Sequence, residues 1–162
     1  MKKLLLLLIF AIIGCQEKSQ EKSSNMQEIS VSSISGDMGC KNCGMNLKKF
    51  ISTSHVIKTI NNESHYFCSI NCSTVASDKI KDNIKSIYAI DYGLTKYFPV
   101  EKMHYVVGST LKGTMTSISK FAFADRNKAE NFMNTFNGKE IVGYSKAFDM
   151  SLQEIQSRIK KD

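Results

Sequence analysis

Two pairs of cysteines limit what this chain can fold into more than any other feature. The first pair is Cys40 and Cys43, followed directly by Gly44, and the second pair is Cys68 and Cys72. Glycine lets the backbone turn sharply after the first pair. Thiolate sulfurs are soft donors that prefer Cu(I), zinc and similar soft metal ions. The sequence therefore predicts that two separate pieces of backbone make or flank one site for a soft metal.

The donor set leaves the choice between copper and zinc open. Four thiolates describe a tetrahedral structural zinc site with Zn–S distances of about 2.3 Å. Two or three sulfurs that include a thioether suit Cu(I), which accepts a lower coordination number. Met45, directly after the first pair, favours copper, although most methionines fill gaps in a core. Met115 lies in a Gly-flanked loop rather than on an apolar face. The candidate ligands are therefore Cys40, Cys43, Met45, Cys68, Cys72 and Met115.

Disulfides are the main alternative to a metal site. Apart from Cys15, which precedes the folded part, the sequence has four cysteines. An even number of cysteines in an exported protein usually indicates disulfides, each of which contributes roughly 2–4 kcal/mol to a small domain. A Cys-x-x-Cys pair also occurs in thiol oxidoreductases, but there it lies where a strand leads into a helix of a βαβ fold. Here it follows a polar segment and precedes hairpins. No nucleophile with a nearby base and no phosphate-binding loop is evident, so we expect a protein that is not an enzyme.

The first residues resemble the signal of a bacterial lipoprotein. Lys2 and Lys3 precede an apolar run over residues 4–13 that is too short to span a bilayer, and Gly14 and Cys15 follow it. We expect residues 1–14 to be removed and Cys15 to be diacylated. This predicts a protein of the bacterial cell envelope, anchored by lipid to a membrane and facing the periplasm or the exterior.

The rest of the chain divides by composition. Residues 15–35 are rich in Gln, Glu, Lys and Ser, which predicts a flexible tether behind the lipidated end. Residues 36–150 suit one small metal-binding domain, and residues 151–162 are expected to form a charged tail. The formal net charge is +7, but the lysines are scattered without interleaved aromatic residues, so we do not expect nucleic-acid binding.

Hydrophobic patterning predicts an α+β domain built from two ββα units. In each unit a strand with aromatic residues leads through a polar cap into an amphipathic helix, at 65–69 and at 121–125. Strands are expected at 55–60, 65–67, 87–92, 103–107, 119–123 and 140–144, and helices at 69–82 and 125–136. In this alignment Ala124 and Lys128 take the places of Cys68 and Cys72, so the sulfur chemistry belongs to the first unit.

Several motifs follow one another in a recognisable order. They are Cys40-x-x-Cys43-Gly44-Met45, the hairpin ending in Phe67, Cys72, 105–109 (Tyr-Val-Val-Gly-Ser), 113–115 (Gly-Thr-Met), 121–123 and the helix ending in 137–139 (Asn-Gly-Lys). Together these motifs resemble the NosL family. NosL proteins are lipoproteins accessory to nitrous oxide reductase, thought to deliver Cu(I) to its copper centres outside the cytoplasm. The resemblance implies a pair of ββα units and metal-binding sulfurs at Cys40, Cys43, Met45 and Met115.

Two departures from the family pattern bear on the metal and on the client. Relatives tend to have acidic residues after the hairpin aromatic, where this chain has Cys68-Ser69 in a sequence similar to the heavy-metal TRASH knuckle (Phe-Cys-Ser-x-x-Cys). Some relatives have a histidine where this chain has Ser117.

From the sulfur motifs and the resemblance we expect a membrane-anchored Cu(I) chaperone that serves an extracytoplasmic cuproenzyme such as nitrous oxide reductase. The alternative is a structural-zinc or disulfide-stapled lipoprotein module with an unknown partner.

Overall fold

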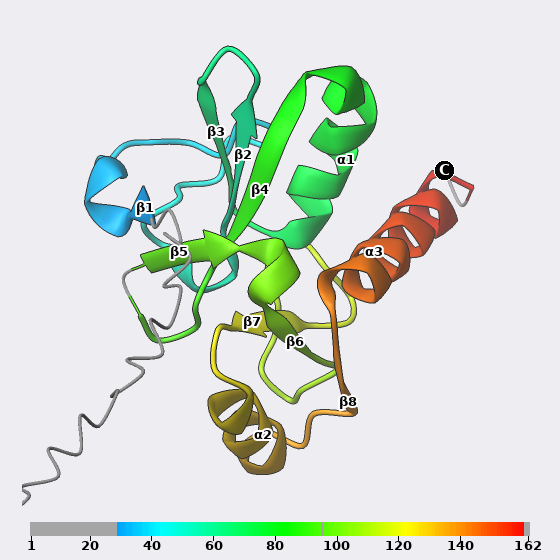
Figure 1. Cartoon of the computed structure of the whole chain (residues 1–162). Coiled ribbons are helices and arrows are strands. Elements are labelled where there is room, and N and C mark those ends of the chain that lie inside the picture. The colour runs from blue at the N-terminus through cyan, green and yellow to red at the C-terminus, as the bar shows by residue number, and fades with distance from the viewer. Residues whose placement is uncertain (1–28, 95, 161–162) are drawn as a thin grey trace, which may run out of the picture.

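The computed structural model describes residues 29–94 and 96–160 (Figure 1). The predicted signal peptide, the lipidation of Cys15 and most of the predicted tether lie outside the described residues. Among the helices of the described part, none is long and apolar enough to cross a membrane.

The described chain is a mixture of short strands and helices, as expected for an α+β protein. The strands are β1 (Ile29–Ser30), β2 (His55–Thr59), β3 (Ser64–Phe67), β4 (Ile84–Ile90), β5 (Lys96–Pro99), β6 (His104–Val107), β7 (Lys120–Phe123) and β8 (Glu140–Val142). The helices are α1 (Ile70–Ile80), α2 (Arg126–Thr135) and α3 (Tyr144–Ile159). Short 3-10 turns lie at Val31–Ser33, Ile51–Thr53, Lys81–Asn83 and Val100–Lys102.

The two ββα units are confirmed, and each gains a third strand after its helix. All pairings are antiparallel, in one sheet of order β1-β5-β4-β2-β3 and another of order β7-β6-β8. In both units the strand after the helix returns to pair with the first strand of the hairpin. The hairpin register also repeats, since His55 lies opposite Phe67 and His104 lies opposite Phe123.

The two helices that follow the hairpins begin with the same side-chain cap. The Ser69 hydroxyl accepts a hydrogen bond from the backbone N–H of Cys72, and the Asp125 carboxylate accepts one from that of Lys128. Such caps satisfy N–H groups that have no partner within the helix. Cys72 and Lys128 therefore occupy equivalent positions, as the sequence alignment of the two units predicted.

Aromatic packing holds α2 on the second sheet. The Phe132 ring lies with its centroid 4.8 Å from that of Tyr92, 5.1 Å from Phe121 and 5.0 Å from Phe123. The centroid of the Phe132 ring also lies 4.7 Å from that of Phe136, at the end of the helix. The helical periodicity predicted for residues 125–136 is thus confirmed.

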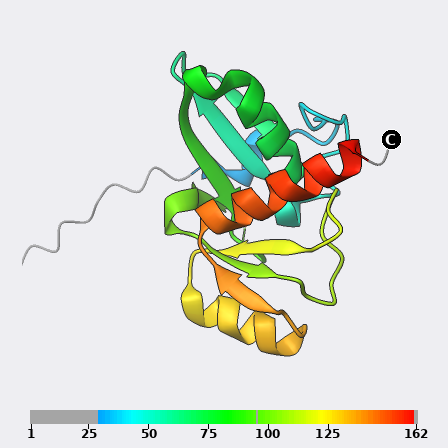
Figure 2. The same cartoon turned by 90° about the vertical axis from the view of Figure 1, so that its right-hand side faces the viewer.

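Helix α1 buries small polar residues beside its apolar side. Ile80 packs against the core cluster that contains Cys72, and the buried residues beyond Cys72 are Ser73, Thr74 and Ser77. These small side chains let α3 pack against α1 (Figure 2). The helix ends at Ile80 rather than at residue 82, because a 3-10 turn leads directly into β4.

The predicted charged tail at 151–162 is wrong, and so is the domain boundary at 150. Helix α3 runs without interruption to Ile159 and buries Ala147 and Ser151 completely. Tyr144 and Met150 of this helix pack against the core, but charged residues such as Glu154 make the segment after residue 150 typical of a solvated one. The helix belongs to the folded domain.

The domain also begins earlier than predicted. Ile29 pairs with Tyr97 and Ser30 pairs with Lys96, which adds β1 to the edge of the first sheet. Residues 29–35 therefore belong to the fold and not to the tether. Strand β5 was missed because it has only four residues and ends in a proline.

Candidate metal centre

The fold brings both cysteine pairs to one place. The sulfur atoms of Cys40, Cys43, Cys68 and Cys72 all lie within 4.8 Å of one another. Three of the cysteines are buried and Cys43 is exposed. The cluster is therefore enclosed by protein on most sides and reaches the surface at one sulfur.

A tight turn presents the first pair. The backbone N–H of Gly44 donates to the carbonyl of Cys40 over 2.8 Å, and the N–H of Cys40 donates to the carbonyl of Met45 over 2.8 Å. Gly44 has φ of +76°, a left-handed conformation that side-chain-bearing residues adopt with strain. The N–H of Lys41 donates to the carbonyl of Tyr66, which fixes the turn against β3.

The junction between β3 and α1 presents the second pair. Cys68 follows the last residue of β3, and Cys72 lies on the first turn of α1, as the sequence predicted. The hydroxyl of Thr53 donates to the carbonyl of Cys68 over 2.8 Å.

The distances between sulfurs fit a shared metal ion. The Cys43 sulfur lies 3.6 Å from that of Cys68 and 3.7 Å from that of Cys72, and Cys68 and Cys72 are 3.7 Å apart. A tetrahedron of sulfurs around an ion at about 2.3 Å has edges of about 3.8 Å. A disulfide requires about 2.05 Å. All four cysteines are free, so the structure does not adopt the disulfide alternative.

The close approach of the thiols gives these cysteines different pKa values. Hydrogen bonds from Cys68 and Cys72 lower the pKa of Cys40 far below that of an ordinary thiol. Donating to Cys40 in turn raises the pKa of Cys68 strongly and that of Cys72 to about 12. An ion that enters the cluster displaces the protons that remain on these sulfurs.

The two methionines predicted as ligands differ in their surroundings. Met45 is half-buried and packs against the apolar cluster that contains Cys40, Cys68 and Cys72. Met115 is 42% exposed and lines a pocket that Cys72 also lines. Both stay predicted ligands, with Met45 beside the cysteines and Met115 on the surface near Cys72.

No histidine joins the sulfur group in the part of the chain that the structure describes. His55 is buried and uses both ring nitrogens, at 3.0 Å from the Thr53 carbonyl and 3.0 Å from the Tyr105 hydroxyl. Burial lowers the pKa of His55 to about 4, so this ring is neutral and structural. His65 lies 3.2 Å from the Glu63 carboxylate.

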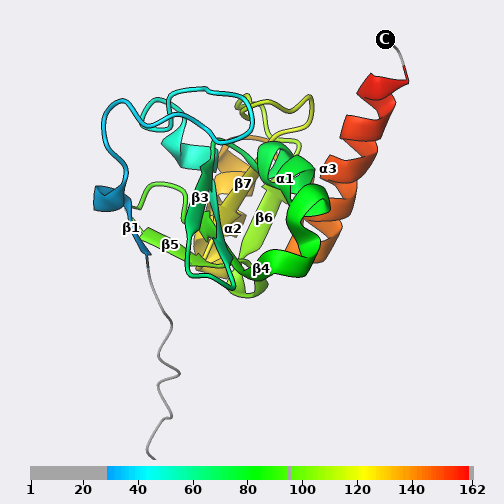
Figure 3. The same ribbon diagram turned by 90° about the horizontal axis from the view of Figure 1, so that it is seen from above.

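Polar residues that the sequence analysis did not single out connect the cluster to the loop 108–119. The Asn71 side-chain amide donates to the carbonyl of Met115 over 3.0 Å. The Thr53 hydroxyl, which donates to Cys68, also lies 2.7 Å from the Thr114 hydroxyl. Figure 3 shows this loop and the cysteine-bearing loop at the same end of the molecule. The partners are far apart in sequence, so no local pattern indicated these contacts.

Comparison with known proteins agrees with this architecture. The sequence model of the NosL family matches residues 31–147. No curated protein matches the chain in sequence. A similar solved structure is that of the copper chaperone NosL from Shewanella denitrificans, with a TM-score of 0.55 and 21% identity over 69% of this chain and 90% of that chain. This likeness shows a shared fold.

Proposed function

The chain belongs to the NosL family, and from this premise we propose that it binds Cu(I) and passes the ion to another protein. The observation that carries the proposal is the cluster of four sulfurs within 4.8 Å of one another. A solved protein of the same fold is a copper chaperone. Binding and transfer, rather than catalysis, is the activity that this family membership supports.

The geometry suits an ion that must be both held and released. Soft thiolates select Cu(I) over the hard cations that are abundant in cells. Cu(I) needs only two or three sulfurs, so a cluster of four offers it alternative partners. The exposed Cys43 gives an acceptor access to an ion that the buried cysteines hold from the other side.

Competition with a chromophoric Cu(I) chelator tests this proposal. We expect the reduced chain of residues 16–162 to bind one Cu(I) tightly. The double variant Cys40→Ser plus Cys43→Ser is expected to lose this tight binding, because the two remaining cysteines cannot complete a site of three thiolates. The double variant Lys48→Ser plus Lys49→Ser, exposed in the same loop, serves as a matched control. Unchanged binding by the cysteine variant would place the copper elsewhere and refute the proposed site.

A structural zinc ion is the second candidate, favoured by the sulfur separations of 3.6–3.7 Å. These are close to the edges of a tetrahedral zinc–thiolate site. A structural ion would remain bound through purification, and a chelator would unfold the domain. Retained zinc that Cu(I) does not displace would exclude the transfer function.

We further propose that the protein acts from a membrane surface in the bacterial cell envelope, on the periplasmic or exterior side. The signal-like residues 1–14 and Cys15 support this, and an extracytoplasmic cuproenzyme such as nitrous oxide reductase is the proposed client. A polar segment behind a lipid anchor would supply reach toward that client.

Removal of the anchoring thiol tests the location. The variant Cys15→Ser, expressed with its full leader, is expected to lose incorporation of labelled palmitate and to move from the membrane fraction to the soluble fraction. Two acyl chains are sufficient for stable anchoring, so this shift should be nearly complete. Ser19→Ala, in the same polar segment, is the control. Membrane association that persists without Cys15 would contradict a lipid anchor.

A further inference from the structure

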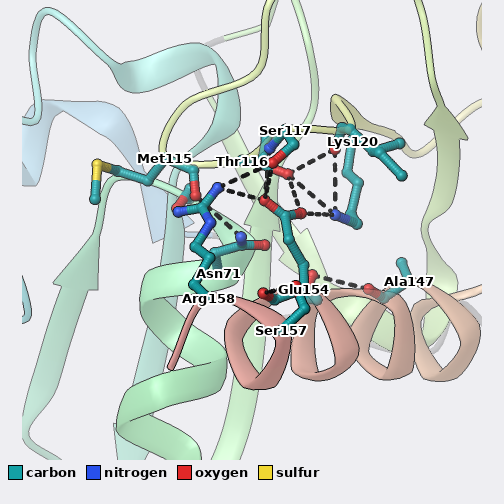
Figure 4. A network of polar contacts seen from close by, with 12 residues as sticks. Asn71, Met115, Thr116, Ser117, Lys120, Ala147, Glu154, Ser157 and Arg158 are labelled. Carbon is teal, nitrogen blue, oxygen red and sulfur yellow. Dashed lines mark hydrogen bonds and ion pairs between the residues drawn. The ribbon is translucent and has the colours of Figure 1, made fainter. Parts of the chain in front are cut away.

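Met115 lies in a backbone conformation that its surroundings must hold in place. Its φ is +53°, in the left-handed region that a residue with a side chain occupies at a cost of roughly 1–2 kcal/mol. Its side chain is exposed, yet its carbonyl is fixed by Asn71, the residue before Cys72. In Figure 4 the thioether points away from the polar network that anchors the loop.

Glu154 of α3 is the centre of that network (Figure 4). Its carboxylate accepts hydrogen bonds from the Ser117 backbone N–H and from the Thr116 hydroxyl, the two residues that follow Met115. It also pairs with Lys120 at 3.2 Å and with Arg158 one turn further along α3. One side chain thus fixes the loop immediately after Met115.

The Glu154 carboxylate is buried and charged. Its side chain is only 9% exposed, and that of Lys120 is 1% exposed. Burial alone would raise the pKa of Glu154, but hydrogen bonds from Thr116 and Ser117 and the charge of Lys120 lower it to about 2. Removing one partner from such a buried pair leaves an uncompensated charge, which is strongly unfavourable.

The loop held by Glu154 forms part of the wall of a pocket beside the cysteine cluster. This pocket, of about 180 Å³, is lined by Asn42, Cys72, Met115 and Arg158 among others. Residues of α3 and of the Met115 loop therefore share a pocket with Cys72. The family match ends at residue 147, so Glu154 lies beyond it.

We propose that Glu154 is a positioning residue that holds Met115 at the pocket beside Cys72, where the thioether receives the ion as it leaves the cluster. This inference rests on the proposed copper transfer. A lone pair of the thioether forms a bond to Cu(I) while the bond to one cysteine thiolate breaks. Copper keeps its oxidation state, and the released thiolate takes a proton from water. The neutral thioether then gives the ion to an acceptor more readily than a thiolate does.

The rate of copper transfer from the loaded chain of residues 16–162 to excess chromophoric chelator tests the proposal. This chain contains every element that the structure describes. We expect Glu154→Ala to slow transfer about tenfold, within the range for supporting residues around a metal site. The equilibrium affinity should change less than twofold, because the four cysteines remain. Met115→Ala should slow transfer equally, and the double variant should show no further loss.

Two further variants separate positioning from general stability. Glu130→Ala on α2 removes an exposed ion pair with Arg126 and should leave the transfer rate unchanged. That pair has the same four-residue spacing as the pair of Glu154 with Arg158. Glu154→Gln keeps an oxygen that accepts from Ser117 and should recover most of the rate. Hydrogen exchange at the Ser117 amide should be fast in Glu154→Ala and slow in Glu154→Gln.

The outcomes distinguish this inference from the proposed function. Wild-type transfer rates in Glu154→Ala, or slowing that adds to that of Met115→Ala, would refute the positioning role while copper binding stands. A wild-type chain that binds no Cu(I) would refute the proposed function and the transfer role with it.

Discussion

Changing Cys68 to serine is expected to weaken Cu(I) binding by more than about 100-fold, beyond the loss typical of outer-shell partners. Cys68 is fully buried and lies within 3.7 Å of the sulfurs of both Cys43 and Cys72. A serine there puts a hard, poorly coordinating oxygen at the centre of the sulfur group. Chelator competition measures the loss, and circular dichroism confirms that the variant folds.

Changing Cys43 to serine should weaken Cu(I) binding only about tenfold, because the three buried thiols remain and Cu(I) accepts three sulfurs. Ser77→Ala is a matched control, since it alters a buried side chain of α1 whose hydroxyl has no hydrogen-bond partner in the described structure. Equal losses at Cys43 and Cys68 would indicate an ion that needs all four ligands. That result would favour structural zinc and contradict a three-sulfur copper site.

Replacing Phe132 by alanine is expected to lower the free energy of unfolding by about 3–5 kcal/mol. Its ring contacts Tyr92 and Phe123 as well as Phe121, so truncation leaves a cavity between α2 and the second sheet. Urea unfolding of the metal-free chain, followed by circular dichroism, gives the difference directly.

Phe136→Ala provides the comparison for Phe132→Ala. Phe136 caps the same helix but is only half-buried, so its loss should cost less than that of Phe132. Because the cysteines belong to the first unit, folded Phe132→Ala should retain most of its Cu(I) affinity. A destabilisation below about 1 kcal/mol would mean that the ring cluster does not hold α2 in place.

The candidate site was predictable where the signal is local. Gly44 after Cys43 indicates a sharp turn, and Ser69 before α1 indicates a helix cap that puts Cys72 on the first turn. The equivalence of Cys72 and Lys128 followed from the same reasoning, because the cap and its partner are three residues apart. The sequence analysis left metal and disulfide as alternatives, and in the structure all four cysteines are free thiols.

The part of the site that was missed depends on side chains that are ambiguous in isolation. Glu154 on a charged segment is typical of a solvated helix face, yet it is buried against Lys120. Ser73 and Thr74 interrupt the apolar pattern of α1, yet they lie inside because α3 covers them. Hydrophobic periodicity alone does not indicate which small or paired charged residues of a helix are buried.

The sequence by itself determined the elements whose causes lie within a few residues: the turn after the first cysteine pair, the two capped helices, and the hairpins that precede them. Only the tertiary structure decided that the four sulfurs come within 4.8 Å of one another as free thiols, that α3 completes the domain, and that Glu154 holds the loop of Met115. The physical reason is that caps, turns and periodicity act between near neighbours, whereas a cluster of four thiols and a buried ion pair join groups whose meeting depends on how the whole chain packs.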